Sequence, residues 1–299
     1  MLVKGLNMKY VVCRIVLAVT VCYGSGVAHA EYKGLFWSIS KDEHTVYALG
    51  SVHLANKSFY PMPANIMAAF DKADELVVEV DDSLISAEEQ QALLMKYALY
   101  PPGQNIYTQL APSVLDQISM LLAEFDQPLK RFAQYKPGMI GVTLSALQGQ
   151  KMGFSADQGL DRYFLQKARY KKSIRQAEDF EFQMQLIGAL PADNAILRDA
   201  FVDMADYEDM WTEMMQSWKD GDAEAMYETT IATALRDFPT LNPYYETLFF
   251  DRHPRMEAAI EDCFSAKKVC FVLYGAGHFL GERGVLAGLK KQGYLVKQL

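Results

Sequence analysis

Two histidines stand in the same local pattern at opposite ends of the chain. His53 closes the segment Gly50-Ser51-Val52-His53 after the apolar run 45–49, and His278 closes Gly275-Ala276-Gly277-His278 after the run 269–274. The β-branched and aromatic residues of each run favour a strand, and glycine lets the backbone turn as it leaves the strand. Open α/β sheets bind ligands at the carboxyl ends of their strands. We therefore expect both histidines to converge on one site if the two strands lie close together.

A third side chain with useful chemistry is Glu79, the one acid in the otherwise apolar run 76–80. A carboxylate is costly to bury on an apolar strand without a partner. Two imidazoles and a carboxylate suit a divalent metal such as Mn, Co, Zn or Fe, and leave positions open for water and substrate. Metal-bound water is a nucleophile near neutral pH. We therefore predict His53, His278 and Glu79 as metal-binding and catalytic residues, with Glu79 either a ligand or the base.

Further charged residues have two explanations each. Glu178 and Glu181 lie at the predicted start of a helix, where the helix dipole favours acids, and this explanation competes evenly with a role in the site. Arg252 precedes the last predicted α/β unit and can bind a carboxylate bidentately, either that of a substrate or that of a structural acid. His44 and His253 fall in predicted turns, where we expect exposed side chains rather than ligands.

Three familiar motifs are incomplete or absent in the chain, and this excludes the functions that depend on them. Gly275-x-Gly277-x-x-x-Gly281 imitates a dinucleotide-binding loop, but too few residues follow Gly281 to complete the βαβ unit that such a loop requires. The chain has no Gly-x-Ser-x-Gly elbow, which excludes a serine hydrolase of that design. It also has no His-Glu-x-x-His segment, the commonest zinc-protease pattern.

Residues 1–30 are typical of a signal peptide. Three basic residues accompany a short apolar segment over 15–21, and Ala28-His29-Ala30 has the small-x-small pattern that signal peptidase cuts. The apolar segment is too short to span a bilayer comfortably, so a retained anchor is the weaker alternative. We predict secretion across the inner membrane to the periplasm or the extracellular space.

The acidic charge of the chain limits which partners it can bind. The chain has 29 basic and 37 acidic residues and a net charge of −8, and loss of the basic leader makes it more acidic. Nucleic acids and anionic lipids need basic patches, so we expect neither as a partner. No other segment is long and apolar enough to cross a membrane after signal cleavage. We expect a peptide or protein substrate, and the oligomeric state has no sequence signal.

Cysteine usage agrees with export. Cys13 and Cys22 leave with the leader, so Cys263 and Cys270 remain. A disulfide between them is chemically reasonable in an oxidising compartment, and free thiols are an equally open outcome. Two cysteines alone do not make a metal site.

Strand–helix–strand patterns near both ends of the chain indicate two related halves. Hydrophobic periodicity predicts, in order, strands at 34–40 and 45–49, a helix at 66–73 and a strand at 75–80, then a helix at 255–264, a strand at 269–274, a helix at 284–292 and a strand from Tyr294. Lys297 stands in the last strand where Glu79 stands in the first unit, in comparable surroundings. This asymmetry predicts one composite site rather than two equivalent sites.

Helical periodicity dominates the middle of the chain. It predicts helices at 114–125, 159–168, 178–188 and within 192–236, with one short strand at 173–177. The methionines of the last stretch are best explained by core packing. We predict an α/β (α+β) fold over 31–299, in which the halves 31–82 and about 252–299 form a central mixed sheet and residues from about 83 to 251 form a large, mainly helical insertion.

Several stretches of the chain resemble one known family. They are Tyr274–Val285 with Lys291–Tyr294, Leu49–His53, Leu76–Asp81, Gly159-Leu160-Asp161, Trp218-x-x-Gly221-Asp222, and the helix that carries Glu178 and Gln183. Together they resemble the TraB/PrgY/GumN family, whose animal relatives are the Tiki proteins. The resemblance covers nearly the whole mature chain.

The resemblance implies an α/β core of two related halves, and a metal-dependent peptidase site that uses both Gly-x-x-His motifs and a glutamate. Carried over, these positions are His53, His278 and Glu79, with Arg252 as an auxiliary. The chain has Arg252-His253 where the family often has Arg-Asn, which leaves the partner of Arg252 open. It has Ala177-Glu178 where the family often has Leu-Glu, which keeps the acid.

We therefore expect an exported metal-dependent hydrolase that acts on peptides. A metal-free hydrolase, with one histidine as general base as in the similar erythromycin-esterase-like proteins, is an alternative. A third possibility is a non-catalytic protein that binds haem, iron or a peptide partner.

Overall fold

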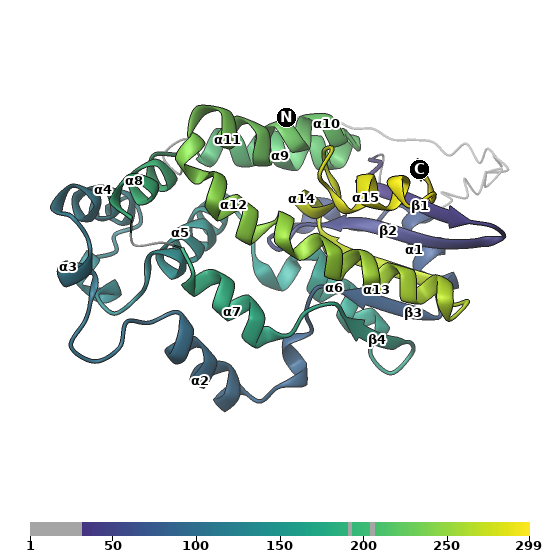
Figure 1. The fold of residues 1–299 in the computed structure, drawn as a ribbon, viewed down its shortest axis with the longest axis horizontal. Helices are drawn as coiled ribbons and strands as arrows, with labels where there is room; N and C mark the ends of the chain where they lie inside the picture. Colours follow the sequence, from purple (N-terminus) through teal and green to yellow (C-terminus); the bar gives the residue numbers. More distant parts are fainter. Residues whose placement is uncertain (1–31, 191–192, 204–206) are drawn as a thin grey trace, which may run out of the picture.

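The computed structural model describes residues 32–190, 193–203 and 207–299 (Figure 1). The predicted signal peptide over 1–30 lies outside these residues. Within them, six strands form one sheet in the order β4-β3-β5-β2-β1-β6. The strands are β1 (Phe36–Lys41), β2 (His44–Ser51), β3 (Glu75–Val78), β4 (Ser173–Gln176), β5 (Cys270–Gly275) and β6 (Leu295–Gln298).

The order of the strands interleaves the two ends of the chain. β1 and β2, predicted as strands at 34–40 and 45–49, form an antiparallel hairpin with Lys41 opposite His44. β5 pairs in parallel with β2 on one side and with β3 on the other, and β3 also pairs in parallel with β4. The antiparallel β1 makes the sheet mixed, which confirms the predicted α/β (α+β) class. The strands that precede the two Gly-x-x-His segments, β2 and β5, are direct neighbours.

The two crossover connections differ. Helix α1 (Ala64–Lys72) joins β2 to β3, whereas α14 (Ala276–Phe279) and α15 (Val285–Lys291) join β5 to β6 at the far edge of the sheet. Lys297 is consequently exposed on an edge strand, whereas Glu79, the residue after β3, is 4% exposed. The expectation that these two residues have comparable surroundings is wrong, because the second crossover carries β6 out to solvent.

Helices make up most of the remaining described chain. They are α2 (Ala87–Tyr97), α3 (Ile106–Gln109), α4 (Pro112–Ala123), α5 (Pro137–Lys151), α6 (Leu160–Ala168), α7 (Phe180–Gly188), α8 (Asn194–Asp203), α9 (Tyr207–Asp220), α10 (Ala223–Tyr227), α11 (Thr233–Asp237), α12 (Asn242–Leu248) and α13 (His253–Ser265). Figure 1 shows α3, α4 and α8 at the end of the molecule away from the sheet.

Two hydrophobic clusters form the core around the sheet and among the helices. The larger one surrounds the sheet and includes Phe271 on β5 and Trp218 on α9. The smaller one lies among the helices and includes Ile118, Leu144 and Phe201. The indole of Trp218 also donates a 2.7 Å hydrogen bond to the carbonyl oxygen of Gly50. This buried contact ties the helical part of the chain to the carboxyl end of β2.

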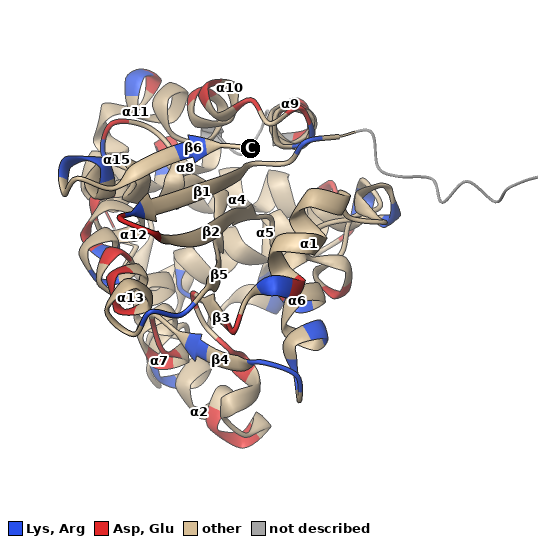
Figure 2. Ribbon diagram, turned by 90° about the vertical axis from the view of Figure 1, so that its right-hand side faces the viewer, with Lys and Arg blue, Asp and Glu red and all other residues tan. Residues whose placement is uncertain are grey.

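Charged residues lie around the sheet rather than in its centre. Figure 2 shows them on helices, in turns and on the strands β1, β3, β4 and β6, whereas β2 and β5 carry none. Among the described residues, no helix is long and apolar enough to cross a membrane.

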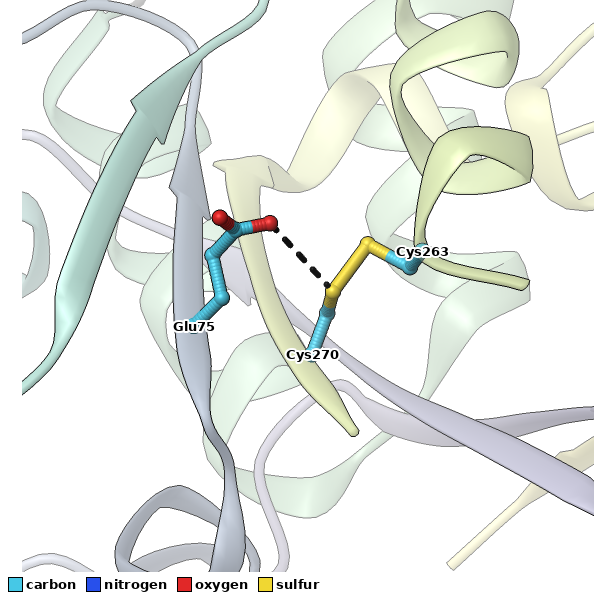
Figure 3. Close-up of side chains that lie close together, drawn as sticks. All are labelled: Glu75, Cys263 and Cys270. Carbon is cyan, nitrogen blue, oxygen red and sulfur yellow. Dashed lines mark hydrogen bonds between the residues drawn. A yellow bond between two sulfur atoms is a disulfide. The ribbon is translucent and has the colours of Figure 1, made fainter. Parts of the chain in front are cut away.

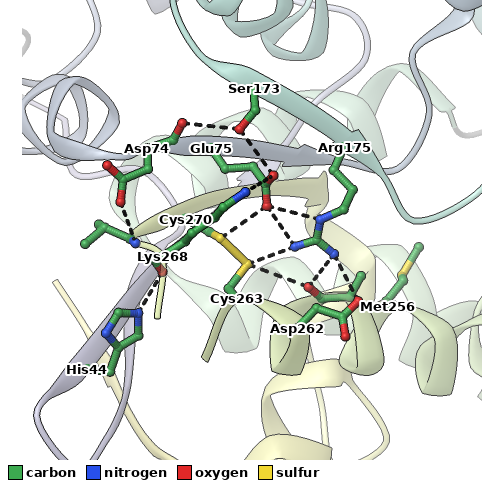
Figure 4. Close-up of polar contacts among 12 residues, drawn as sticks. His44, Asp74, Glu75, Ser173, Arg175, Met256, Asp262, Cys263, Lys268 and Cys270 are labelled. Carbon is green, nitrogen blue, oxygen red and sulfur yellow. Dashed lines mark hydrogen bonds and ion pairs between the residues drawn. A yellow bond between two sulfur atoms is a disulfide. The ribbon is translucent and has the colours of Figure 1, made fainter. Parts of the chain in front are cut away.

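A disulfide joins Cys263 at the end of α13 to Cys270 at the start of β5 (Figure 3). Beside it, the Glu75 carboxylate pairs with Arg175 at 3.0 Å and with Lys268 at 3.1 Å, and Arg175 Nη2 lies 3.1 Å from the sulfur of Cys263 (Figure 4). Glu75 and Cys270 open β3 and β5, so this polar cluster lies at the amino ends of the parallel strands.

Candidate functional site

The predicted site residues meet at the opposite, carboxyl ends of the same strands. His53 lies two residues beyond β2, His278 lies on α14 directly after β5, and Glu79 follows β3. A side-chain carbon placed on Gly275 would lie 3.0 Å from Glu79 Oε1, 3.6 Å from His53 Nε2 and 3.7 Å from His278 Cδ2. The three side chains therefore surround Gly275, where only glycine leaves them room.

A buried ion-pair network supports Glu79. The Arg252 guanidinium donates to Glu79 Oε2 at 2.9 Å and forms a bidentate pair with Glu178 at 2.9 and 2.6 Å. All three residues are less than 7% exposed. The amide of Gln183 approaches both carboxylates at 3.4 Å. Arg252 thus contacts protein acids at this site, and two buried carboxylates share one cation. Glu181, by contrast, faces away and binds Lys96 and Tyr97.

The network keeps Glu79 ionised. Burial alone raises the pKa of its carboxyl, but His278, Arg252 and His53, together with the N–H of Gly275, lower the pKa to about 2. His278 lowers the pKa of Glu79 only when its own ring is protonated. Burial lowers the pKa of His278 to about 3. At neutral pH, Arg252 is therefore the main cation that holds Glu79 in its charged form.

A second histidine fixes the proton position on His278. His253 Nδ1 lies 2.8 Å from the carbonyl oxygen of Arg283, and His253 Nε2 lies 3.2 Å from His278 Nδ1. A carbonyl only accepts, so His253 carries its proton on Nδ1. Burial lowers the pKa of His253, and the neutral ring accepts from His278 Nδ1–H. His278 Nε2 is then free of a proton and lies 3.7 Å from Glu79 Oε1.

His53 has a carboxylate in the corresponding role. Its Nδ1 lies 2.9 Å from Asp161 Oδ2, and Asp161 Oδ1 accepts from the Ser51 hydroxyl at 2.9 Å. The Asp161 carboxylate raises the pKa of His53 to about 9, against the lowering effect of the surrounding protein. The His53 side chain is nevertheless 69% exposed, because it stands at the wall of a cavity. Its Nδ1 is occupied by Asp161, which leaves Nε2 toward the site.

Two of these partners differ from the sequence prediction. His253 was expected in an exposed turn, but it begins α13 and is 4% exposed. That expectation is wrong because the residue before it, Arg252, is held in the buried network and draws the helix start inward. Asp161 was not predicted as a site residue, although Gly159-Leu160-Asp161 had been noted. A side chain on Gly159 would lie 2.2 Å from the His53 carbonyl oxygen, so this glycine lets Asp161 approach. His44 lies elsewhere, against the carbonyl of Lys268.

The donor set fits a divalent metal, although its members are not in contact. Two imidazole Nε2 atoms, each oriented through the other ring nitrogen, and one carboxylate oxygen are donors that Mn, Co, Zn and Fe accept. Among the described residues, only Glu75, Cys263 and Cys270 have three potential ligand atoms within 4.8 Å of one another. The two sulfurs are bonded to each other, so they are not thiolate ligands. Since His278 and Glu79 are 3.7 Å apart, His53 is the more distant member of the site.

The site opens into a cavity of about 670 Å³. His53, Glu79, Arg252 and His278 line it, together with apolar side chains from the helical part of the chain. A concave, mainly apolar pocket with a few convergent polar groups is the usual form of a small-molecule or catalytic site.

The chain is similar in sequence to known proteins. The chain belongs to the TraB/PrgY/gumN family, whose family model matches residues 35–298. It is 24% identical to the uncharacterized protein YbaP of Shigella flexneri, over 64% of this chain and 69% of that protein. It is 22% identical to "Metalloprotease TIKI1" of Danio rerio, over 90% of this chain and 63% of that protein.

The TIKI1 protein of Xenopus tropicalis is 21% identical, over 89% of this chain and 61% of its own length. The chain thus spans about six tenths of the TIKI1 proteins it matches. No solved structure matches the chain.

Proposed function

We propose that this protein is an exported metal-dependent hydrolase that cleaves peptides, with His53, His278 and Glu79 as the metal-binding residues. One observation carries the proposal. Each histidine has its Nδ1 engaged by an outer partner, Asp161 or His253, which leaves both Nε2 atoms as the ring nitrogens that can bind a cation near the Glu79 carboxylate. Such outer partners are typical of metal-binding histidines. The relatives named as metalloproteases support the same reaction class.

The residues around the site have distinct roles in this proposal. A divalent metal, when bound, lowers the pKa of water and polarises a carbonyl. Arg252 and the N–H of Gly275 orient the Glu79 carboxylate, whose free electron pairs then bind the cation or take a proton from water. Glu178 balances the charge of Arg252, which leaves the three groups with one net negative charge. In the metal-free protein the protonated His53 matches this negative charge, and a metal cation would take the place of that proton.

The proposal includes the compartment and the domain organisation. We place the mature protein in the periplasm or outside the cell, on the basis of the leader over 1–30. A disulfide between Cys263 and Cys270 agrees with an oxidising compartment. We assign 31–82 and about 252–299 to the α/β core, with 83–251 as the insertion that covers the site and contributes β4.

The decisive experiment combines metal analysis of the purified mature protein with a peptide-library cleavage assay, with and without chelator. We expect bound metal, cleavage that chelation abolishes, and recovery on adding metal. His53→Ala and His278→Ala should lose both metal and cleavage, whereas His44→Ala, which alters a histidine away from the site, should retain them. Cleavage retained by both site variants, or a protein that neither carries nor acquires metal, would contradict the proposal.

A metal-free hydrolase is the second candidate. The observation that favours it is the ready pairing of Glu79 with Arg252 and Gly275, and of His278 with His253, while His53 stands apart. In this case, His278 Nε2 is the general base. Undiminished activity after exhaustive chelation would select this candidate over the first.

A further inference from the structure

The cavity beside the site has strongly unequal ends. At the sheet end, its acidic and basic lining residues are His53, Glu79, Arg252 and His278. No other described residue that lines it is charged. The walls farther from the sheet come from α5, α8, α9 and α12, and their side chains are mainly aliphatic, aromatic or methionine. An occupant that matches this distribution has one polar end and a long apolar remainder.

The apolar walls exclude an extended peptide backbone from the deep part of the cavity. Every buried peptide unit needs partners for its N–H and C=O groups, and leaving them unpaired is costly. Away from the sheet end, the lining side chains offer few polar groups, namely the hydroxyls of Ser145, Thr230, Tyr244 and Tyr245 and the indole N–H of Trp211. A hydrocarbon chain needs no such partners, and the methionines Met214 and Met215 provide an adaptable surface for it.

The size of the cavity also favours a hydrocarbon chain as its occupant. At about 30 Å³ for each water-sized group, a volume of about 670 Å³ holds on the order of 20 non-hydrogen atoms. This is more than any single amino-acid side chain can fill. It matches a carbonyl group that carries a chain of a dozen or more carbons.

We propose that the natural substrate is an N-acylated amine whose fatty acyl chain occupies this cavity, with its amide carbonyl at Glu79 and His278. The inference rests on the proposed metal-dependent hydrolase activity, and it assigns a fatty N-acyl amide bond, in place of an internal peptide bond, as the bond that is cleaved. In the reaction, the oxygen of water bonds to the acyl carbon and the C–N bond breaks. One proton of water passes to the leaving nitrogen, and the products are a fatty acid and the free amine.

Gly141 on α5 provides a direct way to shorten the cavity. It lines the cavity, and a side-chain carbon built on it meets no atom within 4 Å. Gly141→Leu should therefore add an apolar side chain to this part of the cavity, with room at its first side-chain carbon. Gly141→Ala is the matched control, because it gives the helix the same propensity gain and adds little volume. The neighbouring Val142, which is 45% exposed and also lines the cavity, allows Val142→Thr as a change of polarity at constant shape.

The test measures binding separately from cleavage. N-acylglycines with chains of increasing length would be titrated into the mature protein by calorimetry. Burial of each methylene should tighten binding by about fourfold until the cavity is full. Gly141→Leu should weaken binding of the dodecanoyl probe by at least about tenfold, because the added side chain takes its place, while the butanoyl probe binds as before. Gly141→Ala should resemble the wild type.

Cleavage is then followed as release of glycine from the same probes, with and without added zinc or manganese. If affinity increases with acyl-chain length but no glycine is released, the acyl-chain inference stands and the hydrolase proposal is overturned. Cleavage of unacylated peptides, with no gain in binding on acylation, would retain the hydrolase and overturn the inference. A length dependence that Gly141→Leu leaves unchanged would also overturn it, because the chain would then bind elsewhere.

Discussion

The two Gly-x-x-His segments begin alike and end in different environments. After β2, His53 lies in a loop and is 69% exposed, with Asp161 as its partner. After β5, the chain forms α14, and His278 is 5% exposed with neutral His253 as its partner. The shared pattern sets where each histidine leaves the sheet. The partner and the following backbone determine its charge and burial.

The glycines of the two segments follow the same division. A side chain on Gly50 would press on Ala276 of α14, at 3.1 Å, whereas a side chain on Gly275 would press on Glu79. Gly50 therefore serves packing between the halves, and Gly275 serves the site. In the proposed metal site, His278 and Glu79 are the buried members, 3.7 Å apart, and His53 is the exposed one.

The largest expected effect tests whether the two histidines are equal in chemistry. His53→Ala and His278→Ala should each lower kcat/KM by on the order of 10³-fold or more, because each removes a metal ligand. Steady-state kinetics on a cleaved peptide would measure this loss. If only one variant lost activity, the site would depend on a single histidine, and this would contradict the proposal that both histidines bind the metal.

The next effect contrasts the buried side of the site with the exposed one. Arg252→Met leaves Glu79 and Glu178 without their cation, and should cost about 3–5 kcal/mol of unfolding free energy. Arg162→Met, which removes an exposed ion pair to Asp157 on the His53 side, should cost less than about 1 kcal/mol. Urea denaturation would compare them, and equal losses would show that the Arg252 network is not desolvated as described.

A smaller effect separates the two outer partners. His253→Phe removes the acceptor for His278 Nδ1–H, and should weaken metal binding by about 10–100-fold. Asp161→Asn retains an acceptor for His53 Nδ1–H and removes only the charge, so its effect should be the smaller one. Metal titration of both variants would rank them. The opposite ranking would indicate that charge at His53 matters more than proton position at His278.

The smallest effect is the pH dependence of stability in the metal-free protein. The raised pKa of His53 contributes stability that is complete below its unfolded value of 6.5 and is lost as pH rises through about 9. The lowered pKa of His278 contributes stability that is present above 6.5 and is lost as pH falls toward 3. Denaturation of the wild type and of each alanine variant across this range would test both signs. NMR titration of the rings would report the two pKa values directly, and similar values would remove the contrast.

Sequence patterns predict the elements of the fold that depend on residues close together in the chain. Hydrophobic periodicity predicts the strands at 34–40 and 45–49 and the helix at 66–73, and the structure has β1, β2 and α1 there. The predicted site requires the strands before His53 and His278 to lie close together, and β2 and β5 are neighbours. The disulfide, left open by the sequence, is present in the structure. Each of these features depends on residues close in sequence or on one general rule.

The missed features depend on contacts between distant segments. His253 was placed in an exposed turn because nothing near it indicates that Arg252 reaches two acids more than 70 residues away. Asp161 went unassigned because its meeting with His53 spans 108 residues. The exposure of Lys297 follows from which edge of the sheet β6 joins, and hydrophobic periodicity does not report that choice.

The central place of β5 also has a consequence for how the protein folds. β2 and β3 are formed by residues 44–51 and 75–78, yet they meet through a strand formed by residues 270–275. Contacts of such long sequence separation slow folding, because the intervening chain must be ordered before they form. The sheet therefore has a gap at its centre until almost the whole chain is available. A nascent chain would expose the apolar edges of β2 and β3 throughout its synthesis, and a chaperone that shields strand edges would be needed longest by this part of the molecule.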